Sequence, residues 1–449
     1  MNSFVHDDKD TRAVTVGFTP TLGDGLPASR LEVPGSDRTA AAAPHILLAT
    51  TGQLPSTARL AMELRDAGAQ VSLISPSNHP ARALDLINDR LIYRAWSPRG
   101  SLERALRRLR PDMVVPCDEI TVRDLHAIAQ ATADRFVKQV IVRSTSSISQ
   151  FPIITSRAAL LCLAKRLGVR VPASRPLPEN GTLDEWMKEH RAPFVLKADG
   201  SWAGFGVRIV SNAATAKDAY ANMTRPASGR LAVREALLEG NYFGIRPWLR
   251  GERPAMSVQG YVDGWPANIG VACWQGEVLA SVCAESVATT SATGPSTVAR
   301  IIRNAEMEEA ARRVVGALGL SGMIGFDFMI EAATGDAYLI EMNPRNTPIC
   351  AVRLGAGRDL AEALVARLAG RPERERSPRT EQDIVVFFPD TWKEDPTSHF
   401  LRSGYHDVPW EEPELVRVLM QPERRERYGI LRALRRLWLM VNSDRENPR

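Results

Sequence analysis

The fold is decided by the stretch Gly325-Phe326-Asp327-Phe328-Met329 and by the residues shortly after it, Ala337-Tyr338-Leu339-Ile340-Glu341-Met342-Asn343-Pro344-Arg345. Apolar residues dominate positions 324–330 and 338–342, and the segment between them is long enough for a hairpin. In an antiparallel pair, Asp327 would lie opposite Glu341. Since side chains alternate along a strand, Glu341, Asn343 and Arg345 would project from one face. The stretch therefore predicts a β-hairpin with polar side chains gathered at one end.

The polar side chains of this hairpin suit a metal ion and a phosphoryl group. Two carboxylates and an amide oxygen, from Asp327, Glu341 and Asn343, are hard ligands of the kind that Mg²⁺ takes beside substrate phosphates. A guanidinium next to them, from Arg345, can neutralise the oxyanion that forms during transfer. The same residues would also fit an ordinary β-hairpin with a charged end, so the choice between the two interpretations depends on motifs elsewhere in the chain.

A second motif favours the phosphate interpretation. Residues 193–197 form a short apolar run that ends on Lys197, and a loop containing Gly200, Gly204 and Gly206 follows. Glycines allow backbone N–H groups to approach phosphate oxygens, and a lysine on a rigid strand would offset the phosphate charge. The order of residues differs from the Gly-x-x-x-x-Gly-Lys-Ser/Thr pattern of a P-loop. The two motifs together predict a nucleotide site with magnesium.

The combined pattern resembles the ATP-grasp superfamily in its carbamoyl-phosphate-synthetase-like, carboxylate–amine ligase branch, whose last core strand also reads Glu-x-Asn-Pro-Arg. The resemblance extends from about residue 155 to about residue 370. It implies a two-lobed fold with antiparallel sheets that binds ATP and one or two Mg²⁺ ions, with Mn²⁺ as the alternative metal. In that family the metal ligands would be Asp327, Glu341 and Asn343.

The family also needs an extended hinge that binds adenine through backbone groups. Residues 257–264 fit, with Gln259 at the usual Glu/Gln position and with Tyr261 and Val262 as contacts. A competing register uses Glu235, whose distance from the lysine is closer to the family norm. We favour the first register because only residues 257–264 lead directly into a hairpin.

The acidic residue that many family members use to bind ribose is missing after the hinge. Asp263 and Asn268 are the two candidates to replace it. The nucleoside contacts are therefore the least defined part of the predicted site.

Two further arginines are candidates from the resemblance. Arg157 opens a helical pattern over residues 158–167, at a position where lysine is more typical, and it would contact the phosphates or simply carry a charge at the start of the helix. Arg300 ends the stretch 292–300, which in related enzymes approaches the γ-phosphate and the acceptor. The alternative for Arg300 is a surface residue.

Residues 44–150 predict an N-terminal α/β domain with a parallel sheet, so the fold class is α/β and α+β multidomain. Strand-like runs at 46–49, 71–74, 112–116 and 140–142 alternate with helical patterns at 57–67, 102–109 and 122–131. The loop at 49–53 lacks a Gly-x-Gly-x-x-Gly pattern. Asp118 and Glu119 directly follow a strand, where open α/β sheets tend to bind ligands, and a solvated turn is the alternative.

The remaining boundaries follow from composition. Residues 1–43 lack periodicity and predict a mobile leader. The ATP-grasp domain would cover 151–370 with a central lobe at about 190–262, and 371–449 would form a C-terminal extension. The extension begins with a charged linker, continues through a strand at 384–388 and a loop at 405–410, and ends in a basic amphipathic helix at 424–441. That helix would dock on the body or on a second subunit, as in a homodimer, with a membrane surface as the alternative.

Composition limits the function classes. The chain has 449 residues, 44% hydrophobic and 24% charged, with no apolar run long enough to cross a bilayer and no signal-peptide pattern, so we expect a cytoplasmic protein without a transmembrane segment. Its five scattered cysteines lack zinc spacing and predict buried, reduced thiols. A net charge of +5 suits acidic small molecules and gives little support to nucleic-acid binding.

The resemblance implies an ATP-dependent ligase. A carboxylate would attack the γ-phosphate to give an acyl phosphate, and an amine or another nucleophile would then displace phosphate. One alternative is bicarbonate activation for carboxylation or carbamoylation, although the chain has a single ATP-grasp core and no Met-Lys-Met biotin-carrier motif. A second alternative is a nucleotide-binding regulatory protein without turnover, to which the missing ribose acid and Arg157 give weak support.

Overall fold

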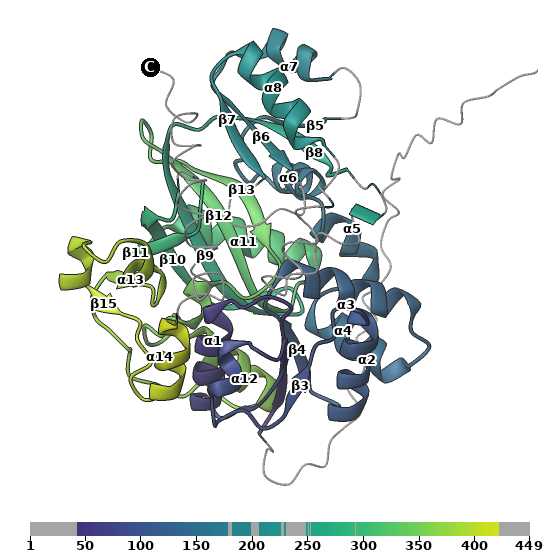
Figure 1. Ribbon diagram of the computed structural model, residues 1–449, viewed down its shortest axis with the longest axis vertical. Helices are drawn as coiled ribbons and strands as arrows, with labels where there is room; N and C mark the ends of the chain where they lie inside the picture. Colours follow the sequence, from purple (N-terminus) through teal and green to yellow (C-terminus); the bar gives the residue numbers. More distant parts are fainter. Residues whose placement is uncertain are drawn as a thin grey trace, which may run out of the picture. The chain divides into compact units, whose positions relative to one another are not determined.

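Three β-sheets organise the part of the chain that the computed structural model describes (Figure 1), which comprises residues 43–177, 182–198, 206–225, 229, 248, 249, 251, 253–291 and 293–421. We call them the N-terminal sheet, the small sheet and the large sheet. Most of the predicted leader, the competing hinge register at Glu235 and the predicted helix at 424–441 lie outside the described residues.

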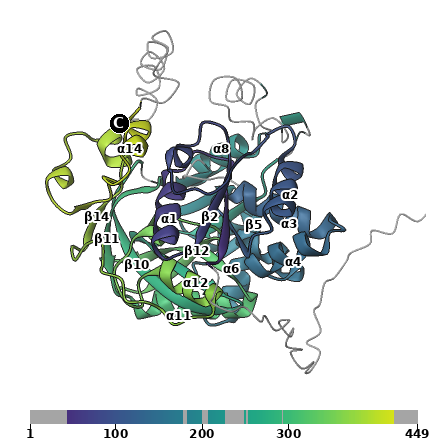
Figure 2. The same cartoon turned by 90° about the horizontal axis from the view of Figure 1, so that it is seen from below.

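The N-terminal sheet is parallel, with strand order β3-β2-β1-β4. Its strands are β1 (His45–Ala49), β2 (Gln70–Ser75), β3 (Arg90–Ile92) and β4 (Met113–Pro116). Helix α1 (Pro55–Asp66) packs on one face, and α2 (Pro98–Leu109) and α3 (Glu119–Ala131) pack on the other (Figure 2). Because both faces are covered, the central strands are continuous apolar runs, as in Ile46-Leu47-Leu48-Ala49.

The strand predicted at 140–142 is wrong, because these residues lie in helix α4 (Arg135–Ser144). Asp134 caps the helix by accepting a hydrogen bond from the backbone N–H of Val137. The buried positions are Val137, Val140, Ile141 and Ser144, which have helical spacing. A short apolar run can belong to either kind of element, so periodicity over three residues could not distinguish them.

The small sheet is antiparallel, with strand order β5-β8-β6-β7. Its strands are β5 (Ser174–Leu177), β6 (Phe194–Ala198), β7 (Val207–Val210) and β8 (Met256–Gly260), and helices α7 (Thr182–Glu189) and α8 (Ala213–Met223) cover one face. Phe194 and Leu196 pack against these helices. Since side chains alternate, Val195 and Lys197 project from the uncovered face.

The large sheet has strand order β13-β12-β9-β10-β11-β14-β15. Its strands are β9 (Gly264–Trp274), β10 (Glu277–Thr289), β11 (Ser296–Ile302), β12 (Gly322–Glu331), β13 (Ala337–Asn343), β14 (Ile384–Val386) and β15 (Tyr405–His406). Helices α6 (Arg157–Arg166) and α11 (Ala305–Leu318) pack on one face, and α12 (Leu360–Ala369) packs on the other. The predicted hairpin is confirmed, since β12 and β13 are antiparallel and Asp327 lies opposite Glu341.

Short elements complete the described chain. They are η1 (Pro80–Ala83), η2 (Ile148–Gln150), α5 (Phe151–Ile154), η3 (Pro348–Ala351), α13 (Asp390–Glu394), η4 (His399–Arg402) and α14 (Pro413–Met420). Two expectations need correction. Tyr405 and His406 form strand β15 where a loop was expected, because they pair with β14. Cys162 is exposed on the solvent side of α6, whereas the other four cysteines are buried. In the described chain, no helix has the length and apolar character needed to span a membrane.

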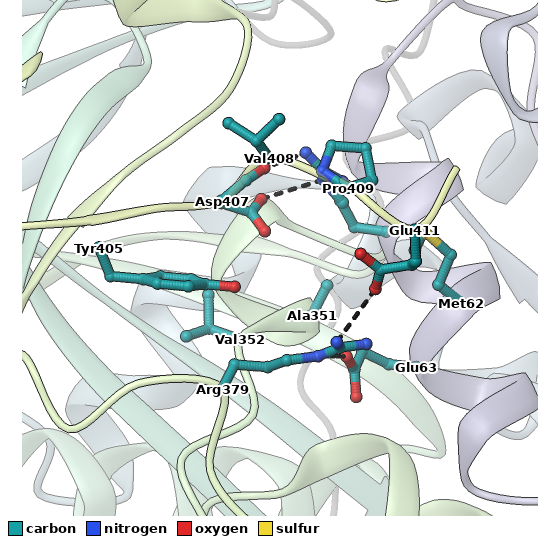
Figure 3. A pocket seen from close by; sticks show the side chains of 11 residues that line it. Met62, Glu63, Ala351, Val352, Arg379, Tyr405, Asp407, Val408, Pro409 and Glu411 are labelled. Carbon is teal, nitrogen blue, oxygen red and sulfur yellow. Dashed lines mark hydrogen bonds and ion pairs between the residues drawn. The ribbon is translucent and has the colours of Figure 1, made fainter. Parts of the chain in front are cut away.

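The segment after α12 is bound tightly to the protein through Arg371, Arg374, Arg376 and Arg379, which we call the arginine strap. Its partners lie on two helices: Glu362 and Asp359 at the start of α12, and Glu63 on α1. Arg379 also reaches Glu411 at 3.0 Å, beside a small cavity of about 40 Å³ (Figure 3). These ion pairs connect the segment after α12 to α1, which packs on the N-terminal sheet, and to α12, which packs on the large sheet.

The strap generates a prediction about Glu362, which is only 1% exposed. Burial alone would raise the pKa of Glu362, but hydrogen bonds from Arg371 and Arg374 outweigh it and bring the pKa to about 2. We expect Glu362→Gln to lower the free energy of unfolding at neutral pH by roughly 1–3 kcal/mol. Because the folded-state pKa lies below the unfolded value of 4.5, this contribution is present above pH 4.5 and is lost as the pH falls toward 2.

Urea denaturation at neutral pH and at about pH 3.5 would measure this difference. Glu375→Gln is the matched control, because Glu375 lies on the same segment but is exposed. A gap between wild type and Glu362→Gln that is equally wide at both pH values would contradict the ion-pair explanation.

Candidate active site

One cavity of about 430 Å³ is lined by residues of both the small and the large sheet. It contains most of the predicted site residues. Lys197, Gln259, Tyr261 and Val262 come from the small sheet and the hinge, Arg157 comes from the start of α6, and Asn268, Asp327, Glu341, Asn343 and Arg345 come from the large sheet and the residues after it. Segments 184 residues apart in the chain therefore meet around one space, as the Arg157–Glu341 contact illustrates.

Arg300 lies apart from this cavity. It is paired across β10 and β11 with Glu285, and their side chains are 3.5 Å apart. Glu285 in turn lies opposite Ala267, the neighbour of the cavity residue Asn268 on β9. Arg300 is not among the residues that line the cavity, whereas Ala267 and Asn268 both are.

The glycine loop is only partly described. Gly206 lies just before β7, where its carbonyl accepts a hydrogen bond from the backbone N–H of Ala198 at 2.8 Å. It is not among the residues that line the cavity. Gly204 lies outside the described residues.

The two carboxylates of the hairpin repel each other. Burial raises the pKa of Asp327 to about 6, and the negative charge of Glu341 adds to the rise. The hydrogen bond that Asn343 Nδ2 donates to Asp327 Oδ2 at 2.8 Å opposes it, as do the charges of Arg345 and Lys197. Arg157 Nη2 donates to Glu341 Oε1 at 2.6 Å. The site thus holds two acids together only by surrounding them with donors and cations.

An orphaned oxygen beside these acids fits a cation. Asn268 lies directly opposite Asp327 across β9 and β12, and its Oδ1 atom is buried without a hydrogen-bond partner among the described residues. In the same part of the chain, no group of three or more His, Cys, Asp or Glu side chains could hold a metal ion. The potential metal ligands are therefore two carboxylates and amide oxygens. This small number of protein ligands suits Mg²⁺ that is bound together with phosphates.

The hinge leaves backbone groups available. Gly260 donates its N–H to the carbonyl of Ala173, and the carbonyl of Asp263 accepts from Ala332. Between them, the backbone N–H and C=O groups of Tyr261 and Val262 make no hydrogen bonds within the described chain. Apolar side chains of Val195, Ile209, Met329 and Ile340 line the same cavity. Free backbone donors and acceptors beside apolar walls suit a flat heterocycle such as adenine.

Arg345 is held by the first residue of α3, a helix that packs on the N-terminal sheet. Its Nε atom donates to Glu119 Oε1 at 2.6 Å, and its Nη atoms reach Asn346 O at 3.0 Å and Asn343 Oδ1 at 3.3 Å. Burial alone would lower the pKa of Arg345, but the charge and hydrogen bond of Glu119 raise it. The neighbouring Asp118 has a different role, because it caps α3 and binds the loop at residues 50–52.

A family comparison matches the part of the chain that contributes most of the cavity residues. The family model of the ATP-grasp domain matches residues 160–348. This part of the chain is therefore similar to the ATP-grasp domain. The matched range begins in α6, includes Lys197, the hinge, Asp327 and the whole Glu341-x-Asn343-Pro344-Arg345 motif, and ends in η3.

Solved structures with a similar fold cover 74–75% of the chain. Biotin carboxylase from Campylobacter jejuni is 16% identical with a TM-score of 0.53, covering 74% of this chain and 72% of that chain. N5-carboxyaminoimidazole synthetase from Staphylococcus aureus, complexed with ADP, is 14% identical with a TM-score of 0.51, covering 74% and 80%. The corresponding synthase from Aspergillus clavatus is 14% identical with a TM-score of 0.53, covering 75% and 80%.

These identities are too low to transfer an activity, but they confirm the predicted fold class, in which a parallel N-terminal sheet precedes the antiparallel sheets of the ATP-grasp region. No curated protein sequence matches this chain. Its function therefore has to be argued from its own site.

Asp327 provides a prediction about the protein without metal or nucleotide. Its folded-state pKa of about 6 lies above the unfolded value of 3.8, so ionisation destabilises the folded state above pH 6, and the penalty vanishes as the pH falls below 3.8. We expect Asp327→Asn to raise the free energy of unfolding at about pH 8 by roughly 1 kcal/mol, allowing for partial solvent access.

Denaturant titrations at about pH 8 and pH 4 would follow this gain, which should nearly disappear at the lower pH. Asp383→Asn is the control, since Asp383 is an exposed acid far from the hairpin in sequence. Loss of stability in Asp327→Asn at the higher pH would refute the proposed repulsion between the two acids.

Proposed function

We propose that this chain is an ATP-dependent ligase that activates a carboxylate substrate as an acyl phosphate, which an amine or another nucleophile attacks with release of ADP and phosphate. The observation that carries the proposal is the shared cavity, which collects a lysine of the small sheet with two acids, an asparagine and an arginine of the large sheet. Cations together with oxygen ligands for a metal are what phosphoryl transfer between two bound molecules requires.

Each side chain has a role in this reaction. Adenine would bind the free backbone groups of Tyr261 and Val262, and Lys197, which is 5% exposed, would offset charge on the phosphates. Asp327, Glu341 and Asn343 would hold Mg²⁺, which when bound screens the phosphate charge. Arg345 would hold the substrate carboxylate and its developing oxyanion.

The remaining cavity residues have secondary roles in the proposal. Asn268 would contribute its orphaned oxygen to the metal or to the ribose. Arg157 would keep Glu341 in place through their 2.6 Å contact and approach the phosphates from the start of α6. Arg300 has no role in the proposal, because it does not line the cavity. The reaction would take place in the cytoplasm on small-molecule substrates.

Bicarbonate activation is the second candidate. It is favoured by the names of the structural neighbours, a biotin carboxylase and two carboxyaminoimidazole synthetases. Bicarbonate is itself a small carboxylate, and the same arginine would hold it. This candidate requires that ADP release depend on bicarbonate in the absence of any other acid, whereas the ligase requires an organic carboxylate.

We expect wild type to release ADP with at least one organic carboxylate in a screen of carboxylate and amine pools. Lys197→Ala and Glu341→Gln should each lower kcat/KM by at least about 100-fold, because each removes charge stabilisation from the transition state. The measurement is coupled ADP release, with hydroxylamine added to trap acyl phosphate as hydroxamate.

Matched controls are available on the surface of the protein. Lys217→Ala removes a lysine on α8 whose side chain is 60% exposed, and Glu309→Gln removes an exposed acid of α11. Both should retain wild-type activity. Equal ADP release by wild type, Lys197→Ala and Glu341→Gln with every pair would make ligation at this site untenable.

A further inference from the structure

Glu119 and Arg345 present opposite charges to the same cavity from different parts of the fold. Glu119 is the first residue of α3 and follows strand β4 of the N-terminal sheet, whereas Arg345 follows β13 of the large sheet. Both residues line the cavity, and their side chains meet at 2.6 Å. An acid and a base in contact at the wall of a site offer two complementary binding groups.

The contact leaves hydrogen-bonding atoms unused on both side chains. Only Oε1 of Glu119 is used, and its Oε2 atom has no hydrogen-bond partner within the described chain. Arg345 uses one N–H on each of its three nitrogens, and a guanidinium has further N–H groups. A free carboxylate oxygen therefore lies close to free guanidinium donors.

The position of Glu119 is fixed by its neighbours. Asp118 caps α3 by accepting the backbone N–H of Thr121 at 2.8 Å, and it also accepts hydrogen bonds from Thr50 and Thr51 in the loop after β1. Glu119 is thus held at the beginning of a capped helix, whose first turn favours negative charge. Such fixed placement is what a binding group needs.

Glu119 also opens onto a second space. A recess of about 80 Å³ adjoins the main cavity, and Glu119, Arg157 and Glu341 line both. Val122, Thr155, Ser156 and Leu160 add apolar and hydroxyl surface to the recess. A molecule in the recess would lie against Glu119, which also lines the cavity that contains Arg345.

We propose that Glu119 binds the ammonium group of the acceptor amine, next to the substrate carboxylate on Arg345. This inference rests on the proposed ligase function and adds to it the residue that receives the second substrate. A carboxylate and an ammonium bound to two side chains in contact would lie close together. Once the ammonium has passed one proton to Glu119 Oε2, the lone pair of its nitrogen can attack the activated carbonyl carbon, and phosphate leaves. The acceptor is accordingly a primary amine that is protonated in water and extends into the recess.

Two nucleophiles distinguish this role from a structural one. Methylamine is the smallest primary amine that is protonated at neutral pH, whereas hydroxylamine is largely uncharged there and needs no anionic partner. Glu119→Gln keeps the shape of the side chain and a carbonyl oxygen for Arg345, but it removes the charge. We expect this variant to raise the KM for methylamine by about 10- to 100-fold. Hydroxamate formation and the KM values for ATP and the carboxylate should stay within about twofold of wild type.

The control is Glu309→Gln, which should leave both products unchanged. An equal loss with both nucleophiles would show that Glu119 only positions Arg345 and would overturn the proposal. So would an unchanged KM for methylamine in Glu119→Gln, or a wild type that forms hydroxamate but no methylamide. Absence of hydroxamate in wild type with every carboxylate would instead overturn the ligase function, and the role of Glu119 with it.

Discussion

The proposed active site depends on the strand register that sets Asp327 opposite Glu341. Like charges directly opposite each other weaken a sheet, and here they are also partly buried. The protein tolerates them because Asn343 and Arg157 donate to them and because Arg345 and Lys197 lie within electrostatic reach. The surrounding structure brings these donors and cations to β12 and β13 from α6, from the small sheet and from the loop after β13.

Local patterns were sufficient to predict much of this arrangement. The hairpin could be predicted because alternation over two strands fixes both its face and its register, and Lys197 could be placed because a buried run ends on it. The arrangement of the small sheet and the large sheet around one cavity could not be derived from such patterns, and only the family resemblance suggested it.

Other features depend on contacts that sequence patterns do not predict. Arg300 pairs with Glu285 on the neighbouring strand and does not line the cavity. The contact between Glu119 and Arg345 joins residues 226 positions apart, so the only signal for Glu119 was an acid just after a parallel strand. The helix at 135–144 was missed because three apolar residues in a row are compatible with either a strand or a helix.

The pairing of β14 with β11 has a consequence for the chain as a folding unit. Strand β14 covers the edge of β11, and Phe387, which directly follows β14, bonds to Thr297 and lines the active-site cavity. A chain that stopped after α12 would therefore lose a wall of the cavity and expose β11 as an unpaired edge, a known route to aggregation. Strands β14 and β15 are thus synthesised after the proposed metal ligands, so a ribosome-bound chain that has emerged only through Arg345 would carry every proposed metal ligand but an open site.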